Sequence, residues 1–378
     1  MKFASTTLVF VVSALLALGL VMLYSATMFH RGGPFWGSQV LWCSIGLVVC
    51  LGMAMVDYQV LKKVSVLALV LALLLLLALM IPGIGLERNG ARRWLQLPGT
   101  TFQPSEFAKL AVIIALAHYC ERKGRGMGTF KYGLLIPGMV LTLFLGLIFI
   151  EPDWGATVLL ATVCGMMLFL AGTKLRYMVP PMIVLGAASG FLLSQNTVRL
   201  NRIMSWLDPE GTKQGVGYQT WQSLIALGSG GTTGLGLGNG RQKLGFVPEN
   251  QTDFIFSVIG EELGLVATMG IVVAFVLFVV CGAYIAMRSR DFFGFLLASG
   301  MTLLISLQGF INIGVVTGTL PNKGLPLPFI SRGGTNLVVM LFCVGVLLSV
   351  ARFASREGQV KTAGANDPGG YSPFRAKS

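Results

Sequence analysis

Apolar stretches long enough to cross a lipid bilayer recur along almost the whole chain. A spanning helix needs about 20 mostly apolar residues, and only helices or closed barrels satisfy their backbone groups inside hydrocarbon. Charged residues make up only 11% of the sequence, against roughly 25% in a soluble domain. The sequence therefore predicts an all-α polytopic membrane protein of about ten transmembrane helices, at residues 7–27, 36–56, 64–82, 104–120, 132–150, 155–172, 177–194, 254–287, 292–316 and 334–352.

The chain is predicted to form a single integral membrane domain over residues 1–352, followed by a polar, disordered cytoplasmic tail at 353–378. The first helix is expected to be retained, since only Lys2 precedes it and no small-residue cleavage site follows. The eighth predicted helix is long enough to be tilted or to have a broken first turn. Between the seventh and eighth helices, residues 195–252 form a large outer loop. Helical spacing at 217–228 predicts an interfacial helix within it.

Lysine and arginine positions give the orientation of the predicted helices. With the N-terminus in the cytoplasm, every short basic connector is also cytoplasmic, as the positive-inside rule expects, and so is the C-terminus. Most of the other basic residues lie in three outer loops, at 83–103, 195–252 and 317–333. Solvation would explain one such loop but not three together. The shared positive charge favours a phosphate or diphosphate ligand.

The positions of the cysteines and histidines do not indicate a metal site or a redox site. The six cysteines fall within or at the edges of apolar spans and have no C-x-x-C spacing, which is typical of buried reduced residues. The two histidines, His30 and His118, stand far apart with no cysteine or acidic pattern around them. Neither a histidine-based metal site nor a Ser-His-Asp triad is predicted.

Asp253 stands where the polar outer loop ends and an apolar helix begins. A carboxylate at a hydrocarbon boundary loses solvation, which is costly unless the group is used. Glu249 precedes it, and Glu261 and Glu262 follow on the predicted helix. Asp253 could instead cap the helix by accepting backbone N–H groups. The local sequence leaves both interpretations open.

Two further groups of charged residues fall on the same outer side. Arg92 and Arg93 beside Trp94 suit either a lipid diphosphate head group or an anchor at the membrane interface. Glu106 and Lys109 are three positions apart, which places them on one face of the fourth predicted helix. An intramembrane ion pair of this kind indicates function, and a purely structural pair is the alternative.

Two turn segments and a glycine-rich run complete the outer loops. Glu151 and Asp153 lie between the fifth and sixth predicted helices, and Lys323 and Ser331 belong to a segment stiffened by proline. Glycine recurs through residues 228–240 and could cradle a phosphate, but the run matches neither a P-loop nor a Rossmann fingerprint. Tight loop turns are the commoner explanation.

These segments, in this order, resemble the SEDS family (shape, elongation, division and sporulation), the polytopic bacterial proteins that include RodA and FtsW. The Lys-Gly pair at 323–324 is more similar to the FtsW division branch. The sequence departs from the family at Arg332, where tyrosine is common, and at Gln251, where histidine is common. The resemblance covers about residues 10–352 and rests on residues 89–94, 103–106, 151–153, 222–231, 252–256, 261–264 and 327–331.

The resemblance implies a peptidoglycan glycosyltransferase that polymerises lipid II into glycan strands and releases polyprenyl diphosphate. The reaction would take place at the outer face of the bacterial cytoplasmic membrane, in cell division or cell-shape maintenance. The implied partners are the growing lipid-linked strand, a class B penicillin-binding protein acting as transpeptidase, and other division or elongation proteins. No nucleic-acid partner is expected.

By resemblance, Asp253 is the base for the attacking hydroxyl, and Glu249 is its helper. No cofactor is implied, and a Mg or Mn ion between carboxylate and diphosphate stays an open alternative because no ligand spacing specifies one. The remaining roles fall to substrate-binding residues: Arg92, Arg93, Lys109 and Lys323 to neutralise the diphosphate, Glu106 to orient Lys109, and Asp153 and Ser331 to line the cavity.

Two other functions stay open. A lipid II flippase or transporter would also use intramembrane charges, but it needs polar groups through the whole membrane depth. The candidate residues instead gather at the outer face. A non-catalytic membrane scaffold of the division machinery would leave Asp253 dispensable.

Overall fold

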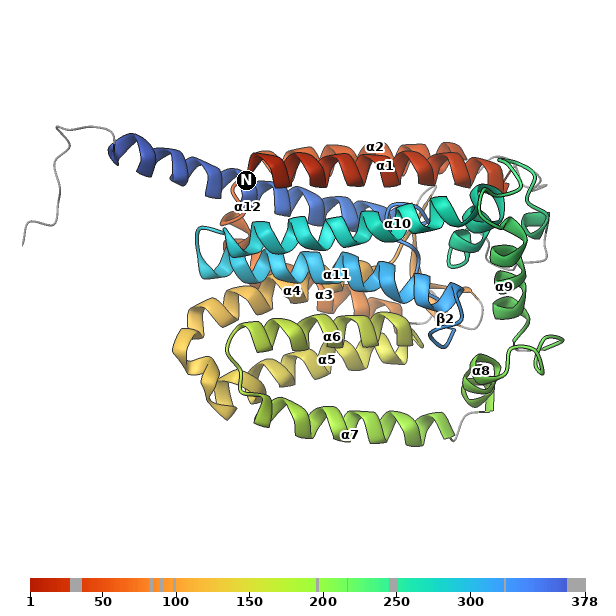
Figure 1. The fold of residues 1–378 in the computed structure, drawn as a ribbon. Coiled ribbons are helices and arrows are strands. Elements are labelled where there is room, and N and C mark those ends of the chain that lie inside the picture. Colours follow the sequence, from red (N-terminus) through yellow and green to blue (C-terminus); the bar gives the residue numbers. More distant parts are fainter. Residues whose placement is uncertain are drawn as a thin grey trace, which may run out of the picture.

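The computed structural model describes residues 1–27, 36–81, 84–88, 91–97, 100–194, 197–215, 217–244, 251–322 and 324–365. Long helices lie roughly side by side in one bundle (Figure 1). Every predicted span coincides with one of them: α1 (Lys2–Thr27), α2 (Trp36–Met55), α3 (Val60–Leu79), α4 (Pro104–Lys123), α5 (Ile136–Ile150), α6 (Trp154–Leu170), α7 (Leu175–Ser194), α10 (Ile255–Met287), α11 (Phe292–Val316) and α12 (Gly334–Ala365).

Within the described residues, seven helical segments are long and apolar enough by themselves to cross a membrane. They are α1, α2, α3, α10, α11, α12 and the segment in which a π-helical turn at Lys131–Leu135 runs into α5. A 3-10 turn at Gly124–Gly128 precedes that segment. The protein is thus a mostly helical membrane protein, as predicted. That α4, α6 and α7 also cross the membrane stays a prediction.

The connection between α3 and α4 contains a small antiparallel sheet that the sequence analysis did not predict. Strand β1 (Gly85–Arg88) pairs with β2 (Ala91–Leu97), which pairs with β3 (Thr100–Phe102). Strands this short show little alternation of apolar and polar residues, and periodicity is the main signal for a strand. The all-α description therefore needs one small sheet added to it.

The described residues between α7 and α10 include two helices. Helix α9 (Tyr218–Gly230) falls where a helix is predicted at 217–228, and its location at the membrane interface stays a prediction; α8 (Thr197–Leu207) was not predicted. A 3-10 turn at Gln242–Leu244 follows. Strand β2, α8 and α9 lie at one end of the bundle, which we call the loop end, and α1 begins and α12 ends at the other (Figure 1).

The last helix is longer than predicted. Residues 353–365 continue α12, and the predicted disordered cytoplasmic tail stays a prediction. Alanine, arginine, glutamate and lysine in this stretch are good helix formers, and they support the extra turns even though the sequence there is no longer apolar. Residues 366–378 lie outside the described part of the chain.

Helix α10 is broken, but not in its first turn. Gly264 has φ 74° and ψ −170°, a conformation that favours glycine. The glycine-rich loop pairs with the backbone on both sides of this break: Leu265 N donates to Gly231 O at 2.9 Å, and Gly236 N donates to Glu262 O at 2.9 Å. The loop and the start of α10 therefore form one unit.

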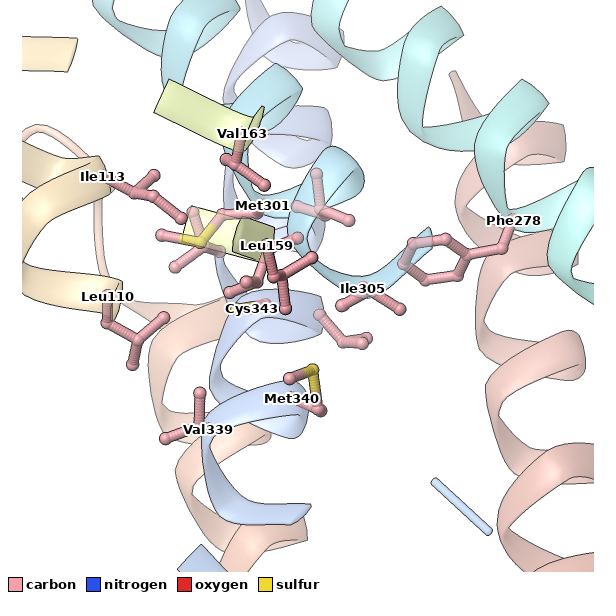
Figure 2. Packing of buried hydrophobic residues seen from close by; sticks show 14 of the residues in the cluster. Leu110, Ile113, Leu159, Val163, Phe278, Met301, Ile305, Val339, Met340 and Cys343 are labelled. Carbon is pink, nitrogen blue, oxygen red and sulfur yellow. The ribbon is translucent and has the colours of Figure 1, made fainter. Parts of the chain in front are cut away.

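Helix α11 lies in the middle of the bundle. Within its 18-residue apolar stretch, 72% is buried inside the protein, against 22% in the corresponding stretch of α3 at the periphery. It packs against α4, α6, α10 and α12, and Met301 and Ile305 lie among Ile113 of α4, Val163 of α6 and Cys343 of α12 (Figure 2). Interiors packed in this way are stiff. Polar side chains on α11 are consequently held in place on a rigid support.

Candidate active site at the loop end

Asp253 belongs to the turn at 251–254 that leads into α10. The N-cap position of this helix is Phe254, and no side chain caps it, so the helix-cap interpretation of Asp253 is not supported. The Asp253 side chain is partly exposed. A Cβ atom added to Gly324 would lie 2.5 Å from Asp253 Oδ2. The carboxylate therefore lies close to the backbone of Gly324 in the 324–332 segment, and a side chain at this position would displace it.

Hydrogen bonds hold residues 251–252 against the same segment. Ser331 Oγ donates to the carbonyl of Thr252 and accepts from Leu327 N at 2.7 Å. Arg332 donates twice to Gln251, from its backbone N to the carbonyl at 2.9 Å and from Nη1 to Oε1 at 3.2 Å. Ser331 is buried and connects two backbone segments. The two positions that depart from the SEDS pattern, 251 and 332, contact each other.

The ion pair predicted from the spacing of Glu106 and Lys109 is formed, at 2.8 Å, with the two side chains 5% and 0% exposed. Two amide side chains complete a closed ring with it. Asn336 Nδ2 donates to Glu106 Oε2 at 2.9 Å, and Lys109 Nζ donates to Gln308 Oε1 at 3.4 Å. Gln308 Nε2 in turn donates to Asn336 Oδ1 at 3.4 Å. We call these four side chains the buried polar ring; they come from α4, α11 and α12.

Two amides on α11 connect this ring to Asp253, and the sequence analysis missed both. Gln308 Nε2 also donates to Pro326 O at 2.9 Å. One helical turn later, Asn312 Nδ2 donates to Leu325 O and to Asp253 O, each at 2.7 Å. The available signal was a pair of amides four positions apart in an otherwise apolar helix, since such positions share one face. The 324–332 segment thus contacts Asp253 directly and reaches Lys109 through Gln308.

Asp153 lies at the start of α6 and is buried. Its Oδ1 accepts from Ala156 N at 3.1 Å, which makes it the N-cap of that helix. Gln103 Nε2, just before α4, donates to Asp153 Oδ2 at 3.5 Å and to Ser105 Oγ at 3.1 Å. Asp153 therefore joins the starts of α4 and α6, close to the helix turn that carries Glu106.

Glu151, in the same turn, is only 6% exposed, and neither carboxyl oxygen has a hydrogen-bond partner in the described part of the chain. Burial, above all, and the nearby Asp153 together raise the pKa of Glu151 to about 8, against the opposing effect of Arg93. Arg93 donates to backbone instead, from Nε to Glu151 O at 2.9 Å and from Nη2 to the carbonyl of Pro152. Glu151 is therefore mostly protonated at neutral pH.

The two arginines of β2 have different partners. Arg93 contacts the turn that contains Asp153, whereas the half-exposed Arg92 pairs with Glu87 of β1 at 3.2 Å. Neighbouring residues of a strand face opposite sides, which separates the two side chains. The other two predicted site residues, Glu249 and Lys323, lie outside the described residues.

The glycine-rich loop binds the protein's own carboxylates. Arg241 N donates to Glu261 at 2.8 Å, and Gly238 N donates to Glu262 at 3.0 Å. Lys243 Nζ forms a buried ion pair with Glu262 at 2.7 Å. Backbone N–H groups that could have bound a phosphate are thus occupied by glutamates of α10, which favours the loop-turn interpretation. Across the described ranges, no group of three or more His, Cys, Asp or Glu side chains is placed to hold a metal ion.

Comparisons with known proteins agree over nearly the whole chain. The sequence model of the FtsW, RodA and SpoVE family, described as cell cycle proteins, matches residues 5–356. A probable peptidoglycan glycosyltransferase FtsW of Trichlorobacter lovleyi is 41% identical over 350 residues, which cover 91% of this chain and 92% of the relative. Stage V sporulation protein E of Bacillus subtilis is 39% identical over 356 residues, covering 92% and 96%.

Solved structures share the fold. A chain from a peptidoglycan synthase complex, studied for its coordination of polymerization and crosslinking, aligns with a TM-score of 0.79 and 27% identity. The alignment covers 92% of this chain and 97% of that one. The rod shape determining protein RodA of Thermus thermophilus aligns with a TM-score of 0.68 and 26% identity, covering 91% and 95%. The similarity therefore extends over about nine tenths of the chain.

Proposed function

The chain belongs to the FtsW, RodA and SpoVE family of cell cycle proteins, and we propose that it is a peptidoglycan glycosyltransferase. In this proposal it polymerises lipid II into glycan strands and releases polyprenyl diphosphate. One structural observation carries the proposal furthest. A partly exposed carboxylate, Asp253, lies against the 324–332 segment at the loop end, and Gln308 connects the buried cation Lys109 to the same segment.

The reaction needs a base and positive charge. The 4-hydroxyl of one sugar attacks the anomeric carbon of a sugar linked to polyprenyl diphosphate. An oxygen–carbon bond forms as the bond from that carbon to the diphosphate oxygen breaks. We propose that Asp253 takes the hydroxyl proton, with Glu249 as its helper, because general-base removal of that proton assists the attack. The leaving diphosphate carries away the electron pair, so cations that stabilise its charge lower the barrier.

The contacts rank the candidate cations. Lys109 is held by Glu106 inside the buried polar ring, and Arg93 is held by two backbone carbonyls beside Asp153. Both are thereby pre-positioned to attract a diphosphate. Arg92 is a weaker candidate because it is exposed and paired with Glu87. Lys323 keeps its proposed role as a diphosphate ligand.

We place the loop end on the extracytoplasmic side of the bacterial cytoplasmic membrane, with both termini in the cytoplasm. The basic connectors at the opposite end support this orientation. A class B penicillin-binding protein is the proposed partner, since a similar chain is part of a peptidoglycan synthase complex. The FtsW relatives favour a role in cell division.

Purified protein and labelled lipid II, with and without a partner transpeptidase, test the proposal. Asp253→Asn keeps the size of the side chain but cannot accept the proton, so we expect polymer formation to fall about 10²–10⁴-fold. Asp208→Asn is the matched control, because Asp208 is an exposed aspartate of the same outer loop. The control should polymerise normally.

Near-normal polymer from a well-folded Asp253→Asn protein would return this residue to a structural role. A wild-type protein that moves lipid II across vesicle membranes but makes no polymer would favour the flippase instead.

A further inference from the structure

Helix α11 carries two buried amides whose positions in the middle of the bundle need an explanation. Gln308 and Asn312 are 0% and 1% exposed, and they follow each other by one helical turn. Burying an amide is unfavourable unless its groups are hydrogen-bonded. Both side chains use their N–H groups on backbone carbonyls of segments that contain or touch the proposed active site.

Asn312 joins two backbone segments that are far apart in the sequence. Its Nδ2 donates to Asp253 O and to Leu325 O, both at 2.7 Å. Leu325 follows Gly324, on which the Asp253 carboxylate rests. One amide therefore sets the separation between the backbone of Asp253 and the segment beneath its carboxylate.

Gln308 fixes the same segment to the buried cation. Its Nε2 donates to Pro326 O at 2.9 Å, while its Oε1 accepts from Lys109 Nζ at 3.4 Å. Pro326 is the neighbour of Leu325, so the two amides hold adjacent carbonyls. Because α11 is the most enclosed of the spanning helices for which burial is described, both amides stand on a rigid support.

We propose that Asn312 is a positioning residue for Asp253, and that Gln308 positions the same segment relative to Lys109. Together they set the distance between the base and the buried cation. This inference rests on the proposed glycosyltransferase function. A displacement of about 1 Å in a reacting group can cost on the order of 10²-fold in rate, so such a device has a measurable effect.

Asn312→Gln is the decisive variant. Glutamine keeps both N–H donors, so the two carbonyls can still be satisfied and the protein should fold, but the donors move outward by one methylene. We expect kcat for lipid II polymerisation to fall about 10–10²-fold, with KM nearly unchanged and the acid limb of the pH–rate profile displaced. Asn312→Leu should lower kcat further, together with some loss of folded yield.

Gln308→Leu is expected to lower kcat as well. Combined with Asn312→Gln, it should cost less than the product of the single effects, because both act through one segment. Ser306→Ala is the control. Ser306 is buried on the same helix, and its hydroxyl has no partner within the described ranges. It should leave kcat and the pH profile unchanged.

The outcomes separate this inference from the function it rests on. Active wild-type protein with a wild-type kcat and pH profile in Asn312→Gln would overturn the positioning role. Loss of folded yield with unchanged kcat per folded molecule would make the amide purely structural, and would overturn it too. Wild-type protein that makes no polymer, alone or with its transpeptidase, would instead refute the proposed function.

Discussion

Two buried lysine–glutamate pairs near the loop end have almost the same geometry. Lys109 and Glu106 are 2.8 Å apart, Lys243 and Glu262 are 2.7 Å apart, and none of the four side chains is more than 5% exposed. Their surroundings differ. Distance and burial are therefore poor guides to what a buried ion pair does, and its other partners have to be compared.

The Lys243–Glu262 pair holds the loop between α9 and α10 in place. Ser25 of α1 donates to Glu262 Oε2 at 2.7 Å and accepts from Lys243 Nζ at 3.0 Å. Gly238 N of the loop also donates to Glu262. The pair thus joins three parts of the chain: the end of α1, the loop and the first half of α10.

The Glu106–Lys109 pair lies within one helix, so it closes no loop. Its other partners are the amides Asn336 and Gln308, and Gln308 leads to Pro326 in the segment that supports Asp253. We infer that the Lys243–Glu262 pair stabilises the fold and that the Glu106–Lys109 pair serves the reaction.

The largest expected effect tests the Glu106–Lys109 pair. Lys109→Met alone leaves Glu106 buried without its counter-charge, which typically costs about 3–5 kcal/mol of stability. The double variant Glu106→Gln/Lys109→Met removes both charges and should melt near the wild-type temperature. Polymer formation should nevertheless stay about 10²–10³-fold down, as when one group that stabilises transition-state charge is lost. Thermal melting measures the stability, and labelled lipid II measures polymer formation.

If Glu106→Gln/Lys109→Met formed polymer at the wild-type rate, the Glu106–Lys109 pair would have only a structural role, and the contrast with Lys243–Glu262 would be refuted.

The next largest effect tests the Lys243–Glu262 pair. Lys243→Met should lower stability by about 3–5 kcal/mol for the same reason. Lys243→Met/Glu262→Gln should recover much of that loss, because glutamine still accepts from Gly238 and Ser25. In this double variant, polymer formation per folded molecule should equal that of the wild type.

If Lys243→Met/Glu262→Gln were stable but inactive, this pair would belong to the active site.

The smallest effect concerns Glu151, a buried carboxyl of the loop end that has no lysine partner in the described part of the chain. Its pKa is raised to about 8, so the folded state binds a proton that the unfolded state has released. Its contribution to stability is therefore present below the ordinary carboxyl pKa and is lost as pH rises towards 8. Glu151→Gln cannot ionise. Its melting temperature should rise relative to wild type between about pH 5 and pH 9.

Parallel melting curves for wild type and Glu151→Gln across that range would show that Glu151 does not titrate there. Asp291 at the other end is a useful reference. Burial alone would raise the pKa of Asp291, but hydrogen bonds from Tyr58, Gln59 and Lys62 lower it overall. Asp291 should behave in the opposite sense to Glu151.

Sequence patterns predicted the helices well because each is a long apolar run, as at α3 and α11. The Glu106–Lys109 pair was predictable too, since a three-residue spacing on a helix leaves little choice of geometry. The small sheet of β1 to β3 was not predicted, because such short strands carry weak periodicity. Helix α8 was not predicted either, although its apolar residues do recur at helical spacing.

Much of the candidate site depends on contacts between distant segments. Ser331 connects its own turn to Thr252, and its expected place in the lining of a cavity stays a prediction. Gln308 and Asn312 were overlooked because an uncharged amide stands out little among apolar neighbours, and its carbonyl partners are invisible in a sequence. The roles of Glu249 and Lys323 stay predictions.

The hydrogen bonds from Asn312, Ser331 and Arg332 to residues 251–253 also have a consequence for biosynthesis. The ribosome makes these three residues after Asp253, and the last of them just before α12. In the nascent chain, the backbone around Asp253 therefore stays unfixed until these later residues have been made. Peptides released early by truncation or ribosome stalling would lack the hydrogen bonds that hold residues 251–253 in place.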